Sequence, residues 1–494
     1  MSTQQTEVSF GKLRQILWPI HGYELKKFIP MFLMFFFVSF NYSLLRVMKD
    51  TLVINAPGSG SEIIPFLKLC TTPAAIIFVS IYIKLSQILS KQKLFYVTLA
   101  PFGVFFLIFP FVLYPSVHLI HPEASADWLQ SFLPDGFRGV VAIYRNWTFA
   151  LFYILAELWG SIVLSTLYWG FANETTKVSE AKRFYALFLI GANVALLFVS
   201  PAAKFANSLG DWGASLKAVN LMAIVGIAGV IACYYFMNNF VLTDSRFANA
   251  APAQKSKKQK LGFMASVKEL ANNRYLAYIA FIVLAYGVSI NLVEVTWKHS
   301  LKVFFDGDKQ AFFNFQATFM SFTGLSTIIF LYLGTNNVLR VLGWKITALI
   351  TPIILMITSM LFFANITFAS FLQGAYVSLG MTPLFLVILI GGIQNVVSKS
   401  AKYAFFDTTK EMAYIPLDDE TKRSGKAAID GVGGRLGKSG GALINAILIG
   451  VMGSIENITS FVAVITIGII FFWIFSVKKL SVEFEKRTSG KESL

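Results

Sequence analysis

Charged side chains stand inside stretches of this chain that are otherwise almost entirely apolar. Arg46 and Lys49 are three residues apart in one such stretch and therefore share one face of a helix. Glu157 lies in the run LFYILAELWGSIVL, with apolar residues for two turns on either side. Because a charge at the centre of a bilayer costs about 2.5–3.5 kcal/mol on insertion scales, each of these residues needs a partner or a function.

Three later apolar stretches carry polar stripes at helical spacing. Their members are Asn291, Glu294 and Lys298; Asn395, Lys399 and Lys402; and Lys426, Asp430, Arg435 and Lys438. The last stripe runs through a series of glycines, which allow close helix packing or a hinge.

Interpretations without a binding function compete for some of these residues. Glu294 with Lys298 could be a structural i,i+4 ion pair, and so could Lys426 with Asp430. A lysine near the end of a span, such as Lys438, could extend to the membrane interface.

Glu157 and Lys49 resist these explanations better. Glu157 has no basic residue within one helical turn, so its partner must come from another helix or from a solute. Lys49 is adjacent to Asp50, but neighbours in sequence point to different faces of a helix. Both residues are therefore candidates for a site shared between helices.

Cations outnumber carboxylates among the candidate cavity residues. The cations are Arg46, Lys49, Lys298, Lys399, Lys426 and Lys438, and the carboxylates are Glu157, Glu294 and Asp430. A cavity with surplus cations attracts an anion, and lysines on several helices suit a phosphate chain held from many sides. The carboxylates could separate the basic groups in an empty cavity or carry coupling protons.

The composition indicates which elements position these residues. Of 494 residues, 56% are hydrophobic and 14% charged, with a mean hydropathy of +0.64, whereas soluble domains are about 25% charged. These values exclude a disordered protein, a cytosolic enzyme and a disulfide scaffold. The two cysteines, Cys70 and Cys233, lie in apolar runs and have no metal-ligand spacing.

Runs of about 20 apolar residues are long enough to cross a bilayer. Twelve spans are predicted, at 29–52, 63–83, 94–115, 146–172, 184–206, 214–240, 275–304, 312–333, 346–364, 380–403, 427–452 and 458–477. The expected fold class is therefore an all-α membrane protein with about twelve transmembrane helices.

A polar break divides the chain into two sets of six spans. We expect an N-terminal six-helix half at 1–242, a cytoplasmic linker at 243–274 and a C-terminal half with a cytoplasmic tail at 275–494. The halves echo one another weakly, because YWGFANETT from Tyr168 resembles YAFFDTT from Tyr403. Such a 6+6 repeat is typical of transporters of the major facilitator type, which bind substrate between their halves.

The net charge of +16 is unevenly distributed. Basic residues crowd the segments on one side, and the opposite side has little beyond Arg138, Arg145 and Lys309. By the positive-inside rule, both termini are expected in the cytoplasm. No cleavable signal peptide is visible, so we expect a bacterial inner-membrane protein, with no nucleic acid among its partners.

A phosphate-binding P-loop is not supported. Gly437-Lys438-Ser439 resembles the end of that motif, but the required glycine is Val432 and no strand precedes it. With no nucleophile–base pair either, the sequence favours neither an enzyme nor a bound cofactor.

Several strings resemble the ATP/ADP translocases of chlamydiae, rickettsiae and plastids. They are LRVMKDTL from Leu45, AELWG from Ala156, SKSAKY from Ser398, TKEMAYIPL from Thr409, GKAAID from Gly425 and LGKSGGALI from Leu436. The opening, from Phe10 to His21, is most similar to the chlamydial members. One departure is the segment GVGGR at 431–435, which is richer in glycine than the family pattern.

The resemblance implies nucleotide exchange and a fold related to the major facilitators. Two lysines and two glutamates are regarded as functionally important in that family. By motif they correspond to Lys49, Glu157, Glu294 and Lys426, with Lys438 as the alternative to Lys426.

The predicted function is therefore exchange of ATP for ADP, with phosphate as a possible co-substrate, by a monomer in the lipid bilayer. The predicted substrate-binding residues are Lys49, Glu157, Glu294, Lys426, Arg46, Asn395, Lys399, Asp430 and Lys438. A proton-coupled nucleotide importer, or an exchanger of other nucleotides or NAD, is the alternative.

Overall fold

The computed structural model describes residues 14, 18–248, 273–333, 335–378, 380–429 and 433–492. Within these ranges the chain is helical and contains no strand. Most of the predicted linker and Asp430 lie outside the described residues.

Eleven of the described helical segments are long and apolar enough to cross a membrane. They are Gly22–Ile54, Ile63–Ile88, Lys91–Leu113, Trp147–Thr175, Arg183–Ser208, Trp212–Val241, Arg274–Phe305, Lys309–Tyr332, Val338–Thr367, Pro383–Ala413 and Ile455–Thr488. A shorter apolar helix, Leu436–Met452, coincides with the predicted span 427–452. Every predicted span thus overlaps an apolar helix, although the eleventh is shorter in the described part of the chain than the sequence suggested.

The spans are built from thirteen main helices. These are α2 (Leu25–Ile54), α3 (Ile63–Ile88), α4 (Lys91–Ile108), α8 (Trp147–Trp159), α10 (Val178–Leu197), α11 (Val199–Ser208), α12 (Trp212–Phe236), α15 (Arg274–Phe305), α16 (Lys309–Leu333), α17 (Thr335–Thr367), α19 (Pro383–Ala401), α22 (Gly434–Met452) and α23 (Ile455–Glu492).

Shorter elements extend or connect them. These are η1 (Gly22–Glu24), η2 (Phe109–Leu113), α5 (Val117–Ile120), α6 (Glu123–Phe132), η3 (Asp135–Phe137), α7 (Arg138–Arg145), η4 (Gly160–Tyr168), α9 (Trp169–Thr175), η5 (Met237–Val241), α13 (Ser245–Ala248), α18 (Ala369–Ser378), η6 (Lys402–Phe406), α20 (Asp407–Ala413) and α21 (Asp419–Ala428).

Polar side chains at the helix starts fix where the apolar runs begin. The carboxylate of Asp211 accepts a hydrogen bond from the backbone N–H of Ala214 at the start of α12, at 2.8 Å. Asn273 caps α15 in the same way through the N–H of Tyr275, at 3.1 Å. These caps satisfy backbone donors that the first turn of a helix leaves without partners.

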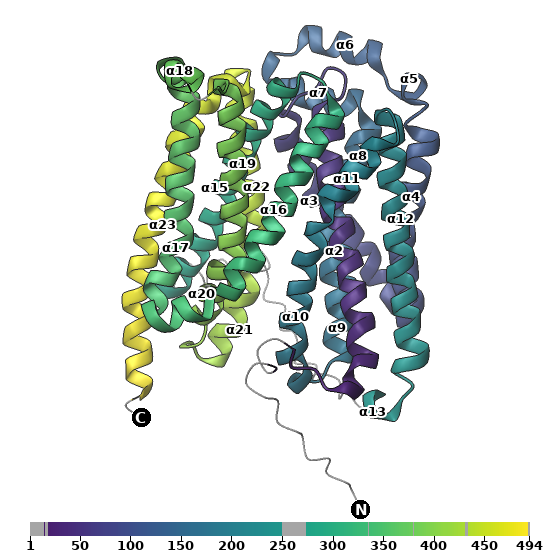
Figure 1. Cartoon of the computed structure of the whole chain (residues 1–494), viewed down its shortest axis with the longest axis vertical. Helices are drawn as coiled ribbons and strands as arrows, with labels where there is room; N and C mark the ends of the chain where they lie inside the picture. The colour runs from purple at the N-terminus through teal and green to yellow at the C-terminus, as the bar shows by residue number, and fades with distance from the viewer. Residues whose placement is uncertain are drawn as a thin grey trace, which may run out of the picture.

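The helices form two groups that lie side by side (Figure 1). We call α2 to α13 the N-terminal group and α15 to α23 the C-terminal group. In the N-terminal group α2 packs against α12, α10 and α8, and in the C-terminal group α15 packs against α22, α23 and α19. Helix α16 also packs against α10 and α11, and α22 against α3, so these helices connect the groups.

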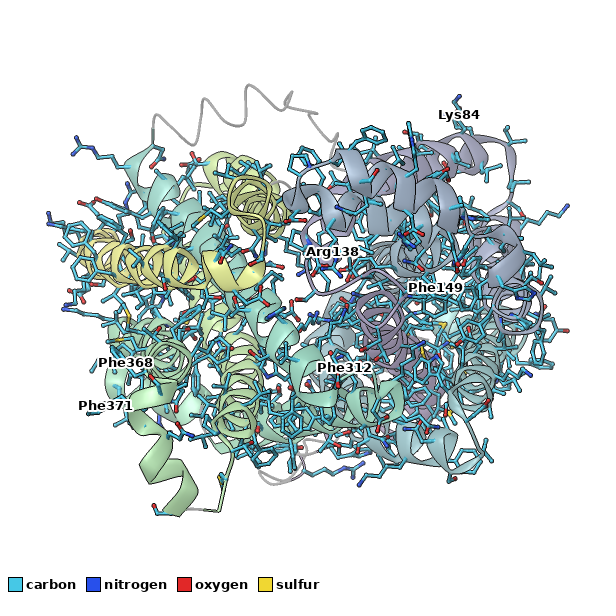
Figure 2. All side chains as sticks on the ribbon, turned by 90° about the horizontal axis from the view of Figure 1, so that it is seen from above. Lys84, Arg138, Phe149, Phe312, Phe368 and Phe371 are labelled. Atoms are coloured by element: carbon cyan, nitrogen blue, oxygen red, sulfur yellow. The ribbon has the colours of Figure 1, made fainter. Side chains whose placement is uncertain are left out.

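The start of α2 and the end of α23 lie at the lower end of the molecule, and α6 and α18 lie at the upper end (Figure 1). The view from above separates the groups clearly, with Arg138 and Phe312 near the boundary between them (Figure 2).

The two segments of the weak sequence repeat have the same local structure. Tyr168 ends the π-helix η4, which is followed by the seven-residue helix α9. Tyr403 lies in the π-helix η6, which is followed by the seven-residue helix α20. A π-helical turn is rare in proteins and is frequent at functional sites, so its recurrence here supports a relationship between the two segments.

Candidate functional site

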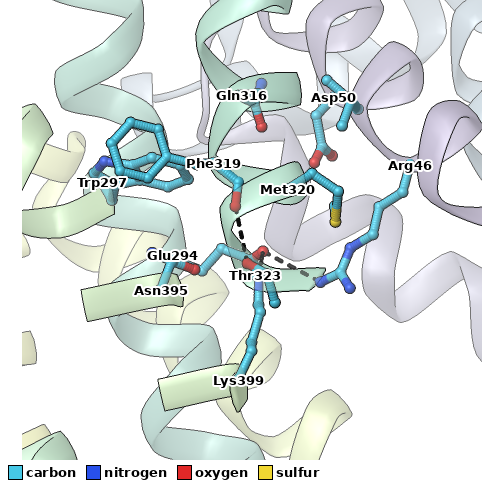
Figure 3. Close-up of a pocket in the computed structure, with 11 residues that line it drawn as sticks. Arg46, Asp50, Glu294, Trp297, Gln316, Phe319, Met320, Thr323, Asn395 and Lys399 are labelled. Carbon is cyan, nitrogen blue, oxygen red and sulfur yellow. Dashed lines mark hydrogen bonds and ion pairs between the residues drawn. The ribbon is translucent and has the colours of Figure 1, made fainter. Parts of the chain in front are cut away.

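A charged cavity lies where α2 of the N-terminal group faces α15, α16 and α19 of the C-terminal group (Figure 3). Its volume is about 30 Å³. The lining residues are Arg46, Val47, Asp50, Glu294, Trp297, Gln316, Phe319, Met320, Thr323, Asn395 and Lys399. Small-molecule pockets span about 300–1,000 Å³, so the helices around this cavity must move apart before a ligand of that size can enter.

Glu294 is the centre of the charge network. Its Oε1 lies 3.4 Å from Arg46 Nη2 and 3.5 Å from the Nζ atoms of both Lys298 and Lys399. Its Oε2 lies 3.2 Å from Lys68 Nζ. Figure 3 shows Arg46 and Lys399 reaching this carboxylate from different helices. Four cations from α2, α3, α15 and α19 therefore share a single carboxylate that is only 5% exposed.

A second set of ion pairs surrounds the end of α2. Lys49 Nζ lies 2.8 Å from Asp50 Oδ1 and 3.0 Å from Glu157 Oε1 of α8. The same ammonium group lies 3.7 Å from the centre of the Tyr153 ring, which adds a cation–π contact. The other Asp50 oxygen lies 2.7 Å from Lys298 Nζ. Lys298 thereby links Asp50 to the Glu294 cluster.

The network carries more positive than negative groups. Within the described residues its cations are Arg46, Lys49, Lys68, Lys298 and Lys399, and its carboxylates are Asp50, Glu157 and Glu294. Burying ions is costly unless they are paired and hydrogen-bonded. Five cations that share three carboxylates leave room for further negative charge, so the arrangement can bind an anion.

Several of these ion pairs cross between the two groups of helices. Arg46 and Lys68 of the N-terminal group contact Glu294 of the C-terminal group, and Asp50 contacts Lys298. Lys68 also donates a hydrogen bond to the side-chain oxygen of Asn291 on α15. The charge network therefore holds the two groups together as well as lining the cavity.

Two adjacent glycines let α19 approach the cavity wall. A Cβ atom on Gly391 would lie 2.2 Å from Trp297 Cδ1, and one on Gly392 would lie 2.3 Å from Phe319 Cε1. The Trp297 indole is fixed by a hydrogen bond of 2.8 Å from its Nε1 to the carbonyl oxygen of Ile388. Glycine at these positions therefore brings Lys399, two turns further along α19, to Glu294.

The upper end of the molecule is closed by direct contact between the groups. Lys302 Nζ of α15 donates to the carbonyl oxygen of Ser59, in the turn after α2. A Cβ atom on Gly136 of η3 would lie 2.5 Å from the carbonyl oxygen of Ile449 and 2.6 Å from that of Gly450, both on α22. Only a glycine fits this approach of backbone to backbone.

The structure brings most of the predicted residues together. Arg46, Lys49, Glu157, Glu294 and Lys399 belong to the ion-pair network. Asn395 lines the cavity, and its amide nitrogen donates to the carbonyl oxygen of Gly391 at 3.0 Å. The i,i+4 pair of Glu294 with Lys298, which was the alternative structural interpretation, is present, but it is one contact among several that Glu294 makes.

Two of the predicted lysines lie apart from this network. Lys426 of α21 forms an ion pair with Glu411 of α20 and lies near the Tyr414 ring. Lys438 of α22 is exposed, and its charge acts on Glu157 without a direct ion pair. Asp430 cannot be placed, because it lies outside the described residues.

Three members of the network are not among the predicted binding residues: Lys68, Asp50 and Lys298, the last of which is predicted only as a candidate cavity cation. Lys68 lies within the predicted span 63–83, and the rule that a charge inside a span needs a partner would have found it. Helical spacing does not predict a pair between Asp50 and Lys49, because neighbours in sequence face different ways. The long Lys49 side chain nevertheless reaches back to one Asp50 oxygen, and Lys298 binds the other.

Comparison with known proteins identifies relatives over the whole chain. The family model described as TLC ATP/ADP transporter matches residues 3–484. ADP,ATP carrier protein 1 of Chlamydia trachomatis is 52% identical over 99% of this chain and 94% of that protein. ADP,ATP carrier protein 1 of Rickettsia prowazekii is 42% identical over 100% of both chains. The plastidic ATP/ADP-transporter of Solanum tuberosum is 44% identical over 93% of this chain and 73% of that protein.

Solved structures show the same fold at low sequence identity. A bacterial homologue of the iron transporter ferroportin, in an inward-facing state, superposes with a TM-score of 0.60 at 13% identity, covering 94% of this chain and 100% of that one. A single-residue mutant of the nucleoside transporter NupG gives a TM-score of 0.52 at 15% identity, covering 92% of this chain and 99% of that one. The predicted major-facilitator-like fold is thereby confirmed.

Proposed function

This chain belongs to the TLC ATP/ADP transporter family, and we propose that its charged cavity binds nucleotide phosphates during exchange of ATP for ADP. Its relatives from chlamydiae, rickettsiae and plastids are named as ADP,ATP carriers or transporters. The chain is accordingly a transporter and not an enzyme. The alternatives of proton-coupled import and of exchange of other nucleotides or NAD are not favoured by these relatives.

The observation that carries this proposal is the sharing of Glu294 by four cations. Each of these cations can leave the Glu294 carboxylate and bind a phosphate oxygen instead, so that it keeps a negatively charged partner. Arg46 can bind two phosphate oxygens at once, whereas Lys68 and Lys399 act as point charges. A polyphosphate supplies several such oxygens in a row, which matches cations that arrive from separate helices.

In this mechanism the carboxylates compete with the nucleotide for the same cations. Without nucleotide, Glu294 and Asp50 hold the cations of both groups in ion pairs. Separating the groups at this level breaks those pairs, and breaking one buried pair costs about 3–5 kcal/mol. A bound nucleotide replaces the lost partners, so the loaded carrier reorients more easily than the empty one. Strict exchange follows from this difference.

We assign Arg46, Lys49, Lys68 and Lys399 to the phosphates, and Glu157, Glu294 and Asp50 to the control of these cations. Asn395 adds a polar group at the same level. Lys426 and Lys438 would act along the nucleotide's path, and Asp430 stays a predicted binding residue. Phosphate could accompany the nucleotide, because it offers the same oxygens to the same cations.

The two groups of helices would reorient around the cavity by alternating access. The upper contact of Lys302 and Gly136 with the opposite group supports a state closed at that end. We place the protein in a bacterial inner membrane as a monomer with both termini in the cytoplasm. The basic residues near both ends of the sequence, and the location of the start of α2 and the end of α23 at one side, support this orientation (Figure 1).

Counter-exchange in proteoliposomes tests the proposal. Vesicles loaded with ADP should take up labelled ATP, and vesicles without nucleotide should not. A pH gradient imposed on empty vesicles is the control for proton coupling. Equal uptake into empty vesicles, or accumulation driven by the pH gradient alone, would contradict strict exchange.

A further inference from the structure

One part of the lining of the central cavity is apolar. It consists of Trp297 of α15 and of Phe319 and Met320 of α16. The centroids of the two rings lie 6.2 Å apart, and their planes are inclined at 71°. Figure 3 shows the rings next to one another and away from the guanidinium group of Arg46. An aromatic wall beside a cluster of cations suits a ligand that joins a flat ring to anionic groups.

Helix α19 fixes both rings. The indole of Trp297 donates its hydrogen bond to the carbonyl oxygen of Ile388, and its ring contacts the backbone at Gly391. The ring of Phe319 contacts the backbone at Gly392 in the same way. A fixed aromatic surface is a suitable platform for a nucleobase, because every base has a π face that can stack.

A buried amide lies beside this aromatic wall. Gln316 precedes Phe319 by three residues and Met320 by four, so the three side chains share one face of α16. Gln316 lines the cavity and is 7% exposed. Its Nε2 atom is buried and has no hydrogen-bond partner among the described residues. Buried amide donors are normally hydrogen-bonded, so this group can take a partner from a ligand that enters the cavity.

The distance from this amide to the charge network suits a nucleotide. Thr323 also lines the cavity, seven residues after Gln316 on α16, and seven steps of 1.5 Å give about 10 Å. The hydroxyl of Ser400, the neighbour of Lys399, donates to the carbonyl oxygen of Thr323 at 3.3 Å, so Thr323 lies near the depth of that lysine. Since one ribose separates the base of a nucleotide from its phosphates, a single nucleotide can reach Gln316 and the cations together.

The amide of a glutamine matches one edge of adenine. On the edge that carries N6 and N7, adenine presents an amino donor beside a ring acceptor. A glutamine pairs with both at once, because its oxygen accepts from the amino group and its nitrogen donates to N7. Guanine and hypoxanthine present two acceptors on this edge, O6 and N7, so the glutamine oxygen would face another oxygen. One glutamine can therefore distinguish adenine from these bases.

We propose that Gln316 selects adenine, with the base stacked against Trp297 and Phe319 and its N6/N7 edge paired with the Gln316 amide. This assignment rests on the proposed exchange of nucleotides and adds the residues that recognise the base. A cavity of about 30 Å³ does not hold a base. The contacts with the base therefore form when the helices around the cavity have moved apart.

The affinities of the purified full chain for ADP, inosine diphosphate, 7-deaza-ADP and pyrophosphate test the assignment, with each ligand titrated by calorimetry. Inosine diphosphate has an oxygen in place of the N6 amino group, 7-deaza-ADP lacks the N7 acceptor, and pyrophosphate lacks the base. We expect ADP to bind about 10-fold more tightly than either nucleotide analogue, because each analogue breaks the bidentate pair.

Matched variants separate the amide from the aromatic wall. Gln316→Met keeps the length of the side chain without its amide, so it should lose the preference for ADP over both analogues. Gln394→Met is the control, because Gln394 of α19 is fully buried and also lacks amide partners among the described residues but does not line the cavity. It should keep the preference. Phe319→Leu should weaken all three nucleotides by about 10-fold through lost stacking. None of these variants should change the affinity for pyrophosphate.

Pyrophosphate separates this assignment from the proposed function. If the unmodified chain binds pyrophosphate but binds the three nucleotides equally, or if the preference for ADP survives Gln316→Met, the assignment of Gln316 is wrong and the phosphate site remains. If neither pyrophosphate nor ADP binds, the proposed function fails and the base site fails with it. Should Gln316→Met bind no pyrophosphate, the variant is misfolded, and the three nucleotides on the unmodified chain decide the question.

Discussion

Lys298 of α15 and Asp50 of α2 form an ion pair that joins the two groups of helices, with Nζ and Oδ2 2.7 Å apart. Both side chains are 3% exposed, so water does not replace either partner when the other is removed. Each residue also has a second partner, Lys49 for Asp50 and Glu294 for Lys298. The pair therefore connects the charges around Glu157 with those around Glu294.

The single variants Asp50→Asn and Lys298→Gln should each destabilise the protein by about 3 kcal/mol, because each leaves a buried charge short of a partner. The double variant should lose less than the sum of the two. Reversible unfolding in mixed detergent micelles measures all three. As a control, Lys402→Gln breaks a half-exposed pair with Asp407 and should cost about 1 kcal/mol or less. Strictly additive losses would show that the two side chains do not interact.

Lys49→Gln should weaken ATP binding by about 10- to 100-fold, because it removes one charged contact to the phosphates. Glu157→Gln removes a competing carboxylate and should leave affinity equal or higher. Titration calorimetry on the purified protein measures both. If Lys49 served only to neutralise Glu157, the double variant Lys49→Gln/Glu157→Gln would bind ATP like the unmodified chain, and the assignment of Lys49 to the phosphates would be wrong.

Lys426 pairs with Glu411 outside the central network, so its substitution should act differently from that of Lys49. Lys426→Gln should raise the KM for nucleotide and weaken the dependence of transport on ionic strength, while the maximal rate changes little. Initial rates of exchange at several salt concentrations test this. Glu411→Gln is the matched variant and should lower the KM, because it frees the lysine. A loss of maximal rate with unchanged KM would instead place Lys426 at the central cavity.

Gly136→Val should prevent closure of the upper end, because its side chain would meet the backbone of Ile449 and Gly450. Transport should fall strongly while the protein still folds. Closure of the upper end is measured through the variant Ser59→Cys, made in a chain that lacks Cys70 and Cys233. Ser59 is buried in the closed state, so an impermeant thiol reagent should label this position only when the upper end is open. Gly468→Val is the control, since a Cβ atom there would meet nothing within 4 Å. Unchanged labelling of the Gly136→Val protein would show that this contact is not a gate.

The spans and most of the charged site could be predicted because both follow from the cost of polar groups in lipid. That cost sets the length of the apolar runs, and it makes Arg46, Glu157 and Lys399 conspicuous. The partner of each charged residue was harder to predict, because a long lysine side chain can reach residues on a different face of its helix. Lys49 reaches its neighbour Asp50 against the direction of its own helix face, and Lys68 was overlooked although it obeys the same rule.

The pairing of Lys426 could not be predicted from spacing. Its partner Glu411 lies fifteen residues earlier on a separate short helix, and only the turn between α20 and α21 brings the two together. The division into an N-terminal half, a linker and a C-terminal half stays a prediction, and so do the roles assigned to individual site residues.

The imbalance of charges in the cavity would make each reorientation step of the carrier sensitive to voltage. Within the described network, the side chains of the site bear two positive charges more than negative ones. ATP carries one negative charge more than ADP, so the two loaded forms differ in the charge that they move across the electric field. Each elementary charge that crosses 100 mV changes the free energy by about 2.3 kcal/mol. A cell's membrane potential would therefore bias the direction of an exchange of ATP for ADP alone, whereas a phosphate that moved with ADP would offset this bias.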